Sequence, residues 1–355
     1  MTDKKRRYDS IHTMKALCAF FVVCLHTSPL PTMAGDLLKM FARIGVPFFF
    51  FVSGFFSYRG EVATAEDRQK RMRKILKHLL ILAGVDLVYI LIALCFQHVS
   101  CAKMLEKLTG WRFLAGNFSV AAHMWFLRCL IYLELIVFFF EKFLNKFKGL
   151  PWLLGIVWIL DVVVCKYSGP LFHFQIPDLY NEFLTKFIGN GVLYFFLGWE
   201  SRRKEAALVK KLEENRKALI LAAAAAAILS VTEYLLVTRL GIDRMPANYI
   251  FTLFLTIMIL LLSLAYRNLG RGSFACYTGM CLSMYIYYWH LLVCNFNRAV
   301  LVKRIGIPKI WAANPVTVYI LSVLLALAIV KAREMWAKRG ARSHGRTLHD
   351  LEDTE

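Results

Sequence analysis

Apolar residues gather along this chain in continuous runs of about 18 to 24 residues, the length that a helix needs to cross the ~30 Å hydrocarbon core of a bilayer. Continuous runs are typical of membrane helices, because the strands of a membrane barrel alternate apolar with polar residues. The pattern predicts an all-α polytopic membrane protein, a bundle of about ten transmembrane helices. The expected spans lie near residues 11–30, 36–58, 75–97, 123–141, 150–166, 184–200, 217–238, 247–266, 274–297 and 313–331.

Basic residues lie in clusters on alternate connections between these runs. The positive-inside rule places such clusters on the cytoplasmic side. An even number of spans then puts both termini in the cytoplasm, with a polar, basic cytoplasmic tail at 332–355. One basic stretch, NRAVLVKRIGIPK at 297–309, falls on the outer side and is an exception that a function would explain.

Composition supports a membrane location. The chain has 355 residues, 58% of them hydrophobic, and 44 Lys and Arg against 24 Asp and Glu, a net charge of +20. Bases beside membrane spans are explained by anionic lipid headgroups, so no nucleic-acid partner is expected. The nine cysteines show no metal-ligand spacing, and no metal is expected. The absence of a phosphate-binding loop and of a dinucleotide glycine fingerprint argues against an ATP-driven pump and a Rossmann enzyme.

Lys15 and His26 interrupt the first apolar run and lie eleven residues apart. At ~100° per residue they share nearly one helix face, ~16 Å apart along the axis. Ionisable groups inside a membrane helix mark a cavity or a partner. We predict that His26 is catalytic, as a general base or a transient acyl carrier. Lys15, near the cytoplasmic end, suits an anionic group such as a phosphate.

Further candidates lie in three other spans. Arg71 and Lys74 are three residues apart at the start of the third span, so they share a face and would clamp one phosphate group. Polar and aromatic side chains of the fourth and ninth spans would bind a substrate. Those predicted substrate-binding residues are Trp125, Arg128, Tyr285 and His290. Anchoring at the membrane interface is the structural alternative for each set.

Four segments, in this order, resemble the integral-membrane acyltransferase family 3. The first is Lys15-x10-His26, and the second is RIGVPFFFFVSGFF at 43–56, whose Ser53-Gly54 pair allows close helix approach. The third is Arg71-Met-Arg-Lys74. The fourth combines HMWFL at 123–127 with SMYIYYWH at 283–290. The chain departs from the family pattern with His12 for a frequent aspartate, Lys74 for the usual arginine and Lys77 for a common proline.

The resemblance implies an acyltransferase-3-like transmembrane domain over 1–331. It implies O-acylation, most often transfer of an acetyl group, from acyl-CoA to a hydroxyl of a surface or lipid-linked carbohydrate. Acetyl-CoA or another acyl-CoA would be the donor substrate, and the bacterial cytoplasmic membrane the location. Lys15, Arg71 and Lys74 would hold the donor phosphates, and His26 would carry the chemistry.

Two other functions fit the same pattern. A secondary transporter or flippase of a glycan-related substrate would explain about ten spans with intramembrane charges and no ATP motif. Against it, no inverted repeat is visible in the sequence. A non-catalytic partner of a glycan-synthesis complex would not need His26 for chemistry. Dependence on acyl-CoA separates the enzyme from both. The acceptor, the acyl group and the oligomeric state stay open at this point.

Overall fold

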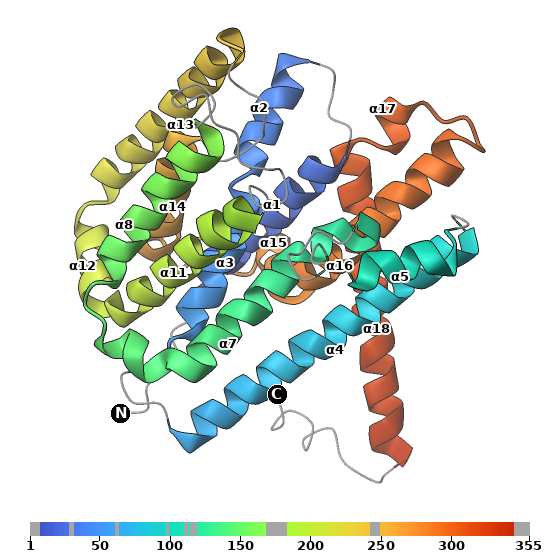
Figure 1. Ribbon diagram of the computed structural model, residues 1–355, viewed down its shortest axis with the longest axis horizontal. Coiled ribbons are helices and arrows are strands. Elements are labelled where there is room, and N and C mark those ends of the chain that lie inside the picture. Colours follow the sequence, from blue (N-terminus) through green and yellow to red (C-terminus); the bar gives the residue numbers. More distant parts are fainter. Residues whose placement is uncertain are drawn as a thin grey trace. The chain divides into compact units, whose positions relative to one another are not determined.

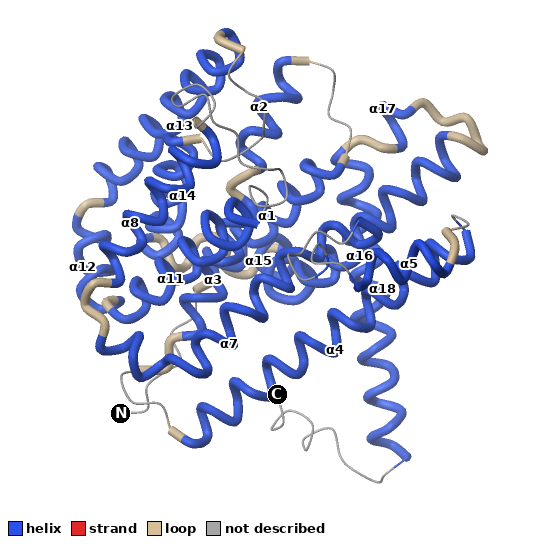
Figure 2. Tube along the Cα trace, in the orientation of Figure 1, coloured by secondary structure: helices blue, strands red, loops and turns tan. Residues whose placement is uncertain are grey.

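The computed structural model describes residues 8–27, 32–60, 64–96, 99–109, 113, 119–167, 183–241 and 249–343. Within these ranges the chain is helical and contains no β-strand (Figure 2). Each predicted apolar run coincides with helical residues (Figure 1). The helices on these runs are α1 (Asp9–His26), α2 (Met33–Ala42), α3 (Gly45–Ser57), α4 (Ala65–Phe96), α7 (Trp125–Lys146), α8 (Leu150–Leu160), α11 (Leu193–Arg203), α13 (Arg216–Arg239), α14 (Ile250–Ala265), α16 (Ser283–Phe296) and α18 (Pro315–Ser343).

Shorter elements connect or extend these helices. The α-helical ones are α5 (Cys101–Thr109), α12 (Glu205–Glu214), α15 (Phe274–Tyr277) and α17 (Lys309–Ala312). A 3-10 helix, η1 (Ser119–Met124), leads into α7. Turns of π-helix widen the chain at η2 (Asp161–Lys166), η3 (Leu184–Val192), η4 (Thr278–Leu282) and η5 (Asn297–Val302). Such turns are frequent at functional sites.

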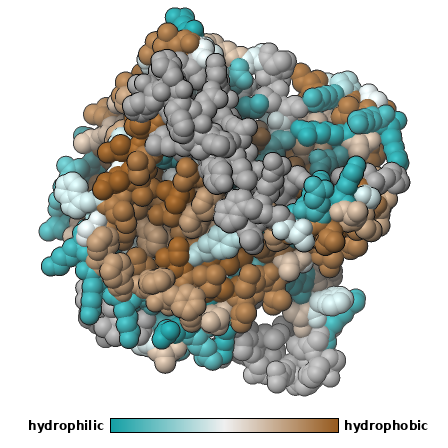
Figure 3. Space-filling model, viewed as in Figure 1, coloured by the Kyte–Doolittle hydropathy of each residue, from teal (hydrophilic) through white to brown (hydrophobic). Residues whose placement is uncertain are grey.

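Several helices suit a lipid environment. In the described part of the chain, five helical stretches are long and apolar enough to cross a membrane, namely Met33–Ser57, Ala65–Phe96, Val120–Lys146, Arg216–Arg239 and Pro315–Arg339. These stretches expose large apolar side chains, for example Leu80 on α4, which is 74% exposed, and Leu221 on α13, which is 70% exposed. Figure 3 shows such side chains over a broad part of the face in view. Because water would disfavour these surfaces, the protein is a multi-pass membrane protein.

The described helices form two compact units. The first unit comprises the described parts of residues 1–11 and 43–269, and the second those of 12–42 and 270–355. Most of α1 therefore belongs to the second unit, together with α2, α16 and α18. Helices α4 and α7 belong to the first unit. Arg71 and Lys74 lie on α4, and α7 forms the fourth predicted span.

Backbone contact between α3 and α11 forms the centre of the first unit (Figure 1). A Cβ atom at Gly54 would lie 1.8 Å from the carbonyl oxygen of Phe195, and one at Gly198 would lie 2.1 Å from that of Phe51. Both distances are far inside van der Waals contact, so only glycine fits at these positions. The close approach predicted from the Ser53-Gly54 pair is confirmed.

In the second unit, α1 is held from two sides. A Cβ atom at Gly279 in η4 would lie 1.7 Å from the carbonyl oxygen of His12, so the two backbones touch. From α18, the Tyr319 hydroxyl donates a hydrogen bond to the Ala16 carbonyl oxygen at 3.1 Å. These contacts fix the helix that carries Lys15 and His26 against η4 and α18.

Candidate active site

His26, the last residue of α1, meets His290 of α16. The centroids of the two imidazole rings lie 5.1 Å apart. His26 is half-buried and His290 is fully buried. The structure therefore brings the predicted catalytic residue beside one of the predicted substrate-binding residues, although they are far apart in the sequence.

The helix that carries His290 also sets the protonation of its ring. Its Nδ1 lies 2.8 Å from the carbonyl oxygen of Tyr287 and 3.1 Å from that of Ile286. A carbonyl oxygen only accepts hydrogen bonds, so the neutral ring carries its proton on Nδ1. The lone pair then lies on Nε2, which makes that atom the acceptor or base of the ring.

Arg298 is the residue at this end of α1 that sequence reasoning did not single out. Its Nη2 donates a hydrogen bond to the carbonyl oxygen of His26 at 3.1 Å. The Cys294 thiol lies 3.6 Å from the same oxygen. The last carbonyls of a helix lack partners within the helix, and its dipole favours a cation there. The one sequence signal was the basic stretch 297–309, which the predicted topology assigns to the outer side.

Lys15 lies on α1, as predicted, and is half-buried. It lies close enough to the Cys281 thiol in η4 for an electrostatic interaction. Tyr285, one turn further along the same run, accepts a hydrogen bond from Nη1 of Arg333 on α18 at 3.1 Å. Lys15, His26, Tyr285 and His290 are thus all parts of the second unit.

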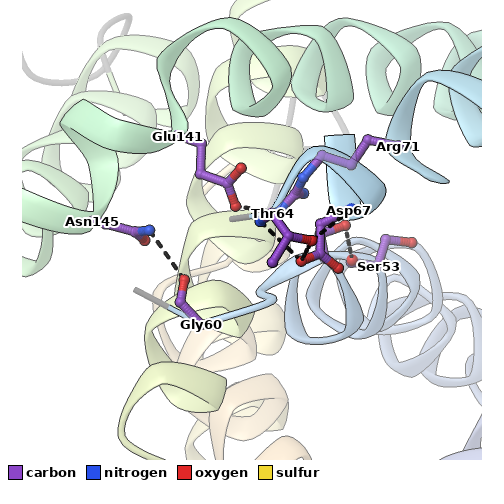
Figure 4. A network of polar contacts seen from close by, with 8 residues as sticks. Ser53, Gly60, Thr64, Asp67, Arg71, Glu141 and Asn145 are labelled. Carbon is purple, nitrogen blue, oxygen red and sulfur yellow. Dashed lines mark hydrogen bonds and ion pairs between the residues drawn. The ribbon is translucent and has the colours of Figure 1, made fainter. Parts of the chain in front are cut away.

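Arg71 and Lys74 lie on α4, and each faces a carboxylate of α7. Arg71 forms a buried ion pair with Glu141, and both side chains are drawn in Figure 4. The Nζ atom of Lys74 lies 2.9 Å from Oε1 of Glu134, with the Lys74 side chain 40% exposed and that of Glu134 5% exposed. Of Arg71 and Lys74, only Lys74 keeps substantial access to solvent.

A capping box fixes the start of α4 and hence the orientation of these bases. The Thr64 backbone N–H donates to Oδ2 of Asp67, and the Asp67 N–H donates to Oγ1 of Thr64, both at 3.1 Å (Figure 4). The Asn145 side chain at the end of α7 donates to the Gly60 carbonyl oxygen at 3.1 Å. The end of α7 is therefore tied to Gly60, four residues before the cap of α4.

Two predicted substrate-binding residues, Trp125 and Arg128, lie in the first turn of α7. Arg128 forms a buried ion pair with Asp86 of α4, and its guanidinium carbon lies 4.8 Å from the ring centroid of Phe113. The Trp125 ring lies 5.8 Å from Nζ of Lys186. An aspartate within an apolar run demands a cation nearby, which is the signal that Asp86 carried in the sequence. The identity of that cation emerged only from the fold.

A comparison with protein-family models assigns the chain. The model described as an acyltransferase domain, that of acyltransferase 3, matches residues 8–331. No curated protein and no solved structure was found to match the chain. The matched range includes every candidate site residue predicted from the sequence. The chain therefore belongs to the acyltransferase 3 family and is a membrane acyltransferase.

Proposed function

We propose that the protein transfers an acyl group from acyl-CoA to a hydroxyl group of a cell-surface carbohydrate, with acetyl as the favoured acyl group. The observation that carries this proposal is the pair of imidazole rings of His26 and His290, 5.1 Å apart inside the acyltransferase domain. Imidazole exchanges protons near neutral pH, as acyl transfer to a hydroxyl requires.

In the proposed reaction His26 is the general base. It accepts the proton of the carbohydrate hydroxyl while that oxygen attacks the thioester carbonyl carbon. The carbon–sulfur bond then breaks, and the proton passes from His26 to the sulfur of coenzyme A. A transient acyl group on His26 would give the same products in two steps. His290 offers the Nε2 lone pair as an acceptor that orients the incoming hydroxyl.

The donor phosphates are assigned to Lys15, Arg71 and Lys74. Support comes from the Lys74 side chain, which is 40% exposed and already attracts an oxyanion, the carboxylate of Glu134. Arg71 is held by Glu141, so a phosphate there would share or displace that carboxylate. Trp125, Arg128 and Tyr285 remain the proposed contacts to the carbohydrate.

The membrane topology is part of the proposal. About ten spans with both termini in the cytoplasm of a bacterial cell place the basic N-terminus inside and the His26 end of α1 toward the outer side. The donor would then enter from the cytoplasm, and the carbohydrate would arrive from the outer side.

The test measures coenzyme A release from acetyl-CoA by the full-length protein in lipid nanodiscs, with and without native envelope glycan. We expect release that rises with glycan, and a loss of at least about a hundredfold in His26→Ala, the typical contribution of a general base. Leu17→Ala is the matched control, because Leu17 is exposed on the same helix. It should keep wild-type release.

Two outcomes would overturn the proposal. Equal release by the wild type and His26→Ala would remove His26 from the chemistry. A wild-type protein that neither binds nor cleaves acetyl-CoA, but moves a substrate across the bilayer with protons, would be a transporter.

A further inference from the structure

The connection between α16 and α18 carries four basic residues, namely Arg298, Lys303, Arg304 and Lys309. We call this stretch, residues 297–309, the outer basic segment. No aspartate or glutamate occurs between residues 295 and 314. Lys303, Arg304 and Lys309 are exposed, and Arg298 is half-buried. The segment therefore concentrates positive charge without internal compensation.

The basic residues of the outer basic segment differ from three arginines elsewhere in the chain that are buried or half-buried. Arg71, Arg128 and Arg203 each form an ion pair with a glutamate or aspartate. None of the four basic residues of the outer basic segment has a carboxylate partner among the described residues. A group of cations left in this state is ready to bind an anion from outside the chain.

The fold holds this segment in a defined shape. The buried Asn297 side chain donates a hydrogen bond to the Ala312 carbonyl oxygen at 2.7 Å, which ties the start of the segment to α17. The Ile307 N–H donates to the Leu301 carbonyl oxygen at 2.9 Å. Between Leu301 and Ile307 the chain turns at Gly306, whose φ of 84° suits glycine. The charges are thus fixed relative to the end of α16.

Arg298 connects the segment to the candidate catalytic histidine. One of its N–H groups is used at the His26 carbonyl oxygen. A guanidinium has five N–H donors in a planar fork, so the rest of the group is available to an oxyanion. An anion bound there would lie next to the residue that is proposed to activate the acceptor hydroxyl.

We propose that the outer basic segment binds the acceptor, and that the acceptor is an anionic saccharide bearing carboxylate or phosphate groups. This inference rests on the proposed function and names its substrate class. The segment is the one basic cluster that departs from the positive-inside rule, so membrane orientation does not account for it. Anionic lipid headgroups share the same chemistry, and the test separates the two sources.

The experiment uses full-length protein in nanodiscs of zwitterionic lipid, in which a glycan is the added anion. One probe is fluorescent oligogalacturonate, with its carboxyl-reduced, neutral form as reference. In parallel, acetyl transfer is measured to the envelope glycan before and after carboxyl reduction and dephosphorylation. The variant is Lys303→Gln/Arg304→Gln/Lys309→Gln, and the charge-matched control is Lys210→Gln/Lys211→Gln/Lys217→Gln, three exposed lysines of the first unit.

We expect the wild type to bind and acylate the acidic glycan at least about tenfold better than the neutral form, as charge complementarity predicts. The triple variant of the outer basic segment should lose that preference, and the control should keep it. Equal use of both glycans by an enzyme that still shows His26-dependent coenzyme A release would overturn this inference alone.

Two further results would also overturn it. An equal loss of binding in both triple variants would mean non-specific attraction to net charge. A preference that appears only after phosphatidylglycerol is added to the nanodiscs would assign the segment to headgroups. Failure of coenzyme A release in the wild type would instead refute the proposed function.

Discussion

Two buried ion pairs of the first unit join α4 to α7. Arg71 pairs with Glu141 nearer one end, and Arg128 pairs with Asp86 further along. A buried ion pair adds little net stability, but removal of one partner leaves an uncompensated charge, with a loss of ~3–5 kcal/mol. The proposed contact of Arg128 with the carbohydrate can therefore be tested separately from its contribution to stability.

Replacing Arg128 by Met should destabilise the protein strongly, because Asp86 is then left without its partner. The double variant Arg128→Met/Asp86→Leu should recover most of the loss in thermal unfolding, since both charges are gone. If Arg128 also contacts the carbohydrate, the double variant will be stable but will show a raised KM for the glycan. A stable double variant with unchanged kinetics would exclude Arg128 from the substrate site.

At this scale the sequence displays polar residues within apolar runs but not their partners. Asp86 and Glu233 stand out because they interrupt apolar runs. The structure shows that Glu233 of α13 accepts hydrogen bonds from the backbone N–H groups of Ile250 and Phe251, each at 2.8 Å. These are the first residues of α14, whose N–H groups have no partner within the helix. Such a cap supplied by a neighbouring helix leaves no local sequence pattern.

At the scale of elements, glycine determines how closely helices approach. Gly54 and Gly198 lie where α3 and α11 touch backbone to backbone. Gly84 lies in the middle of α4 with open space where its Cβ would be. The same substitution is therefore expected to have opposite effects at these positions.

Gly54→Ala and Gly198→Ala should each lower the melting temperature in detergent, because the new methyl group would force the helices apart at a loss of at least ~1–3 kcal/mol. Gly84→Ala should leave stability unchanged or raise it by up to ~1 kcal/mol, since alanine is the better helix former. Thermal unfolding of the three variants under identical conditions tests this. Equal melting temperatures would show that the α3–α11 contact is looser than described.

Hydropathy predicted the positions of the helices well but not their breaks. The run at 36–58 is divided between α2 and α3 around residues 43–44, in front of Gly45 and Pro47. Proline lacks the N–H that would continue the helical hydrogen bonding. The run at 274–297 contains the π-helical turn η4. A π-turn changes the backbone and not the apolar composition, so a hydropathy profile cannot detect it.

At the scale of the whole molecule, contacts between distant segments define the site. Tyr319 contacts Ala16 from α18, and His290 contacts His26 from α16. Neither pairing follows from apolar periodicity, which reports that a face is buried and not what covers it. The family resemblance named both histidines, but their proximity is a result of the fold. The membrane topology, by contrast, can be predicted from charge alone and tested directly.

A native cysteine reports the topology. Cys101 at the start of α5 is exposed and follows the third predicted span, so the proposed topology predicts that it lies on the outer side. A membrane-impermeant maleimide should label Cys101 in intact spheroplasts, and Cys101→Ser should remove that label. In the Cys101→Ser background, Lys210→Cys on α12 should be labelled only after permeabilisation. Labelling in the reverse order would invert the proposed orientation.

The contact between Gly54 and Gly198 also has a mechanical consequence. Two helices that touch through their backbones cannot slide or rotate past each other, because any shift of register brings a Cβ atom into the contact. α3 and α11 must therefore move together as one rigid pair. The α4–α7 interface is held by long, bendable side chains such as Lys74 and Glu134. If the first unit has to open to admit the thioester end of the donor, it would hinge at the α4–α7 interface, and the α3–α11 pair would stay rigid.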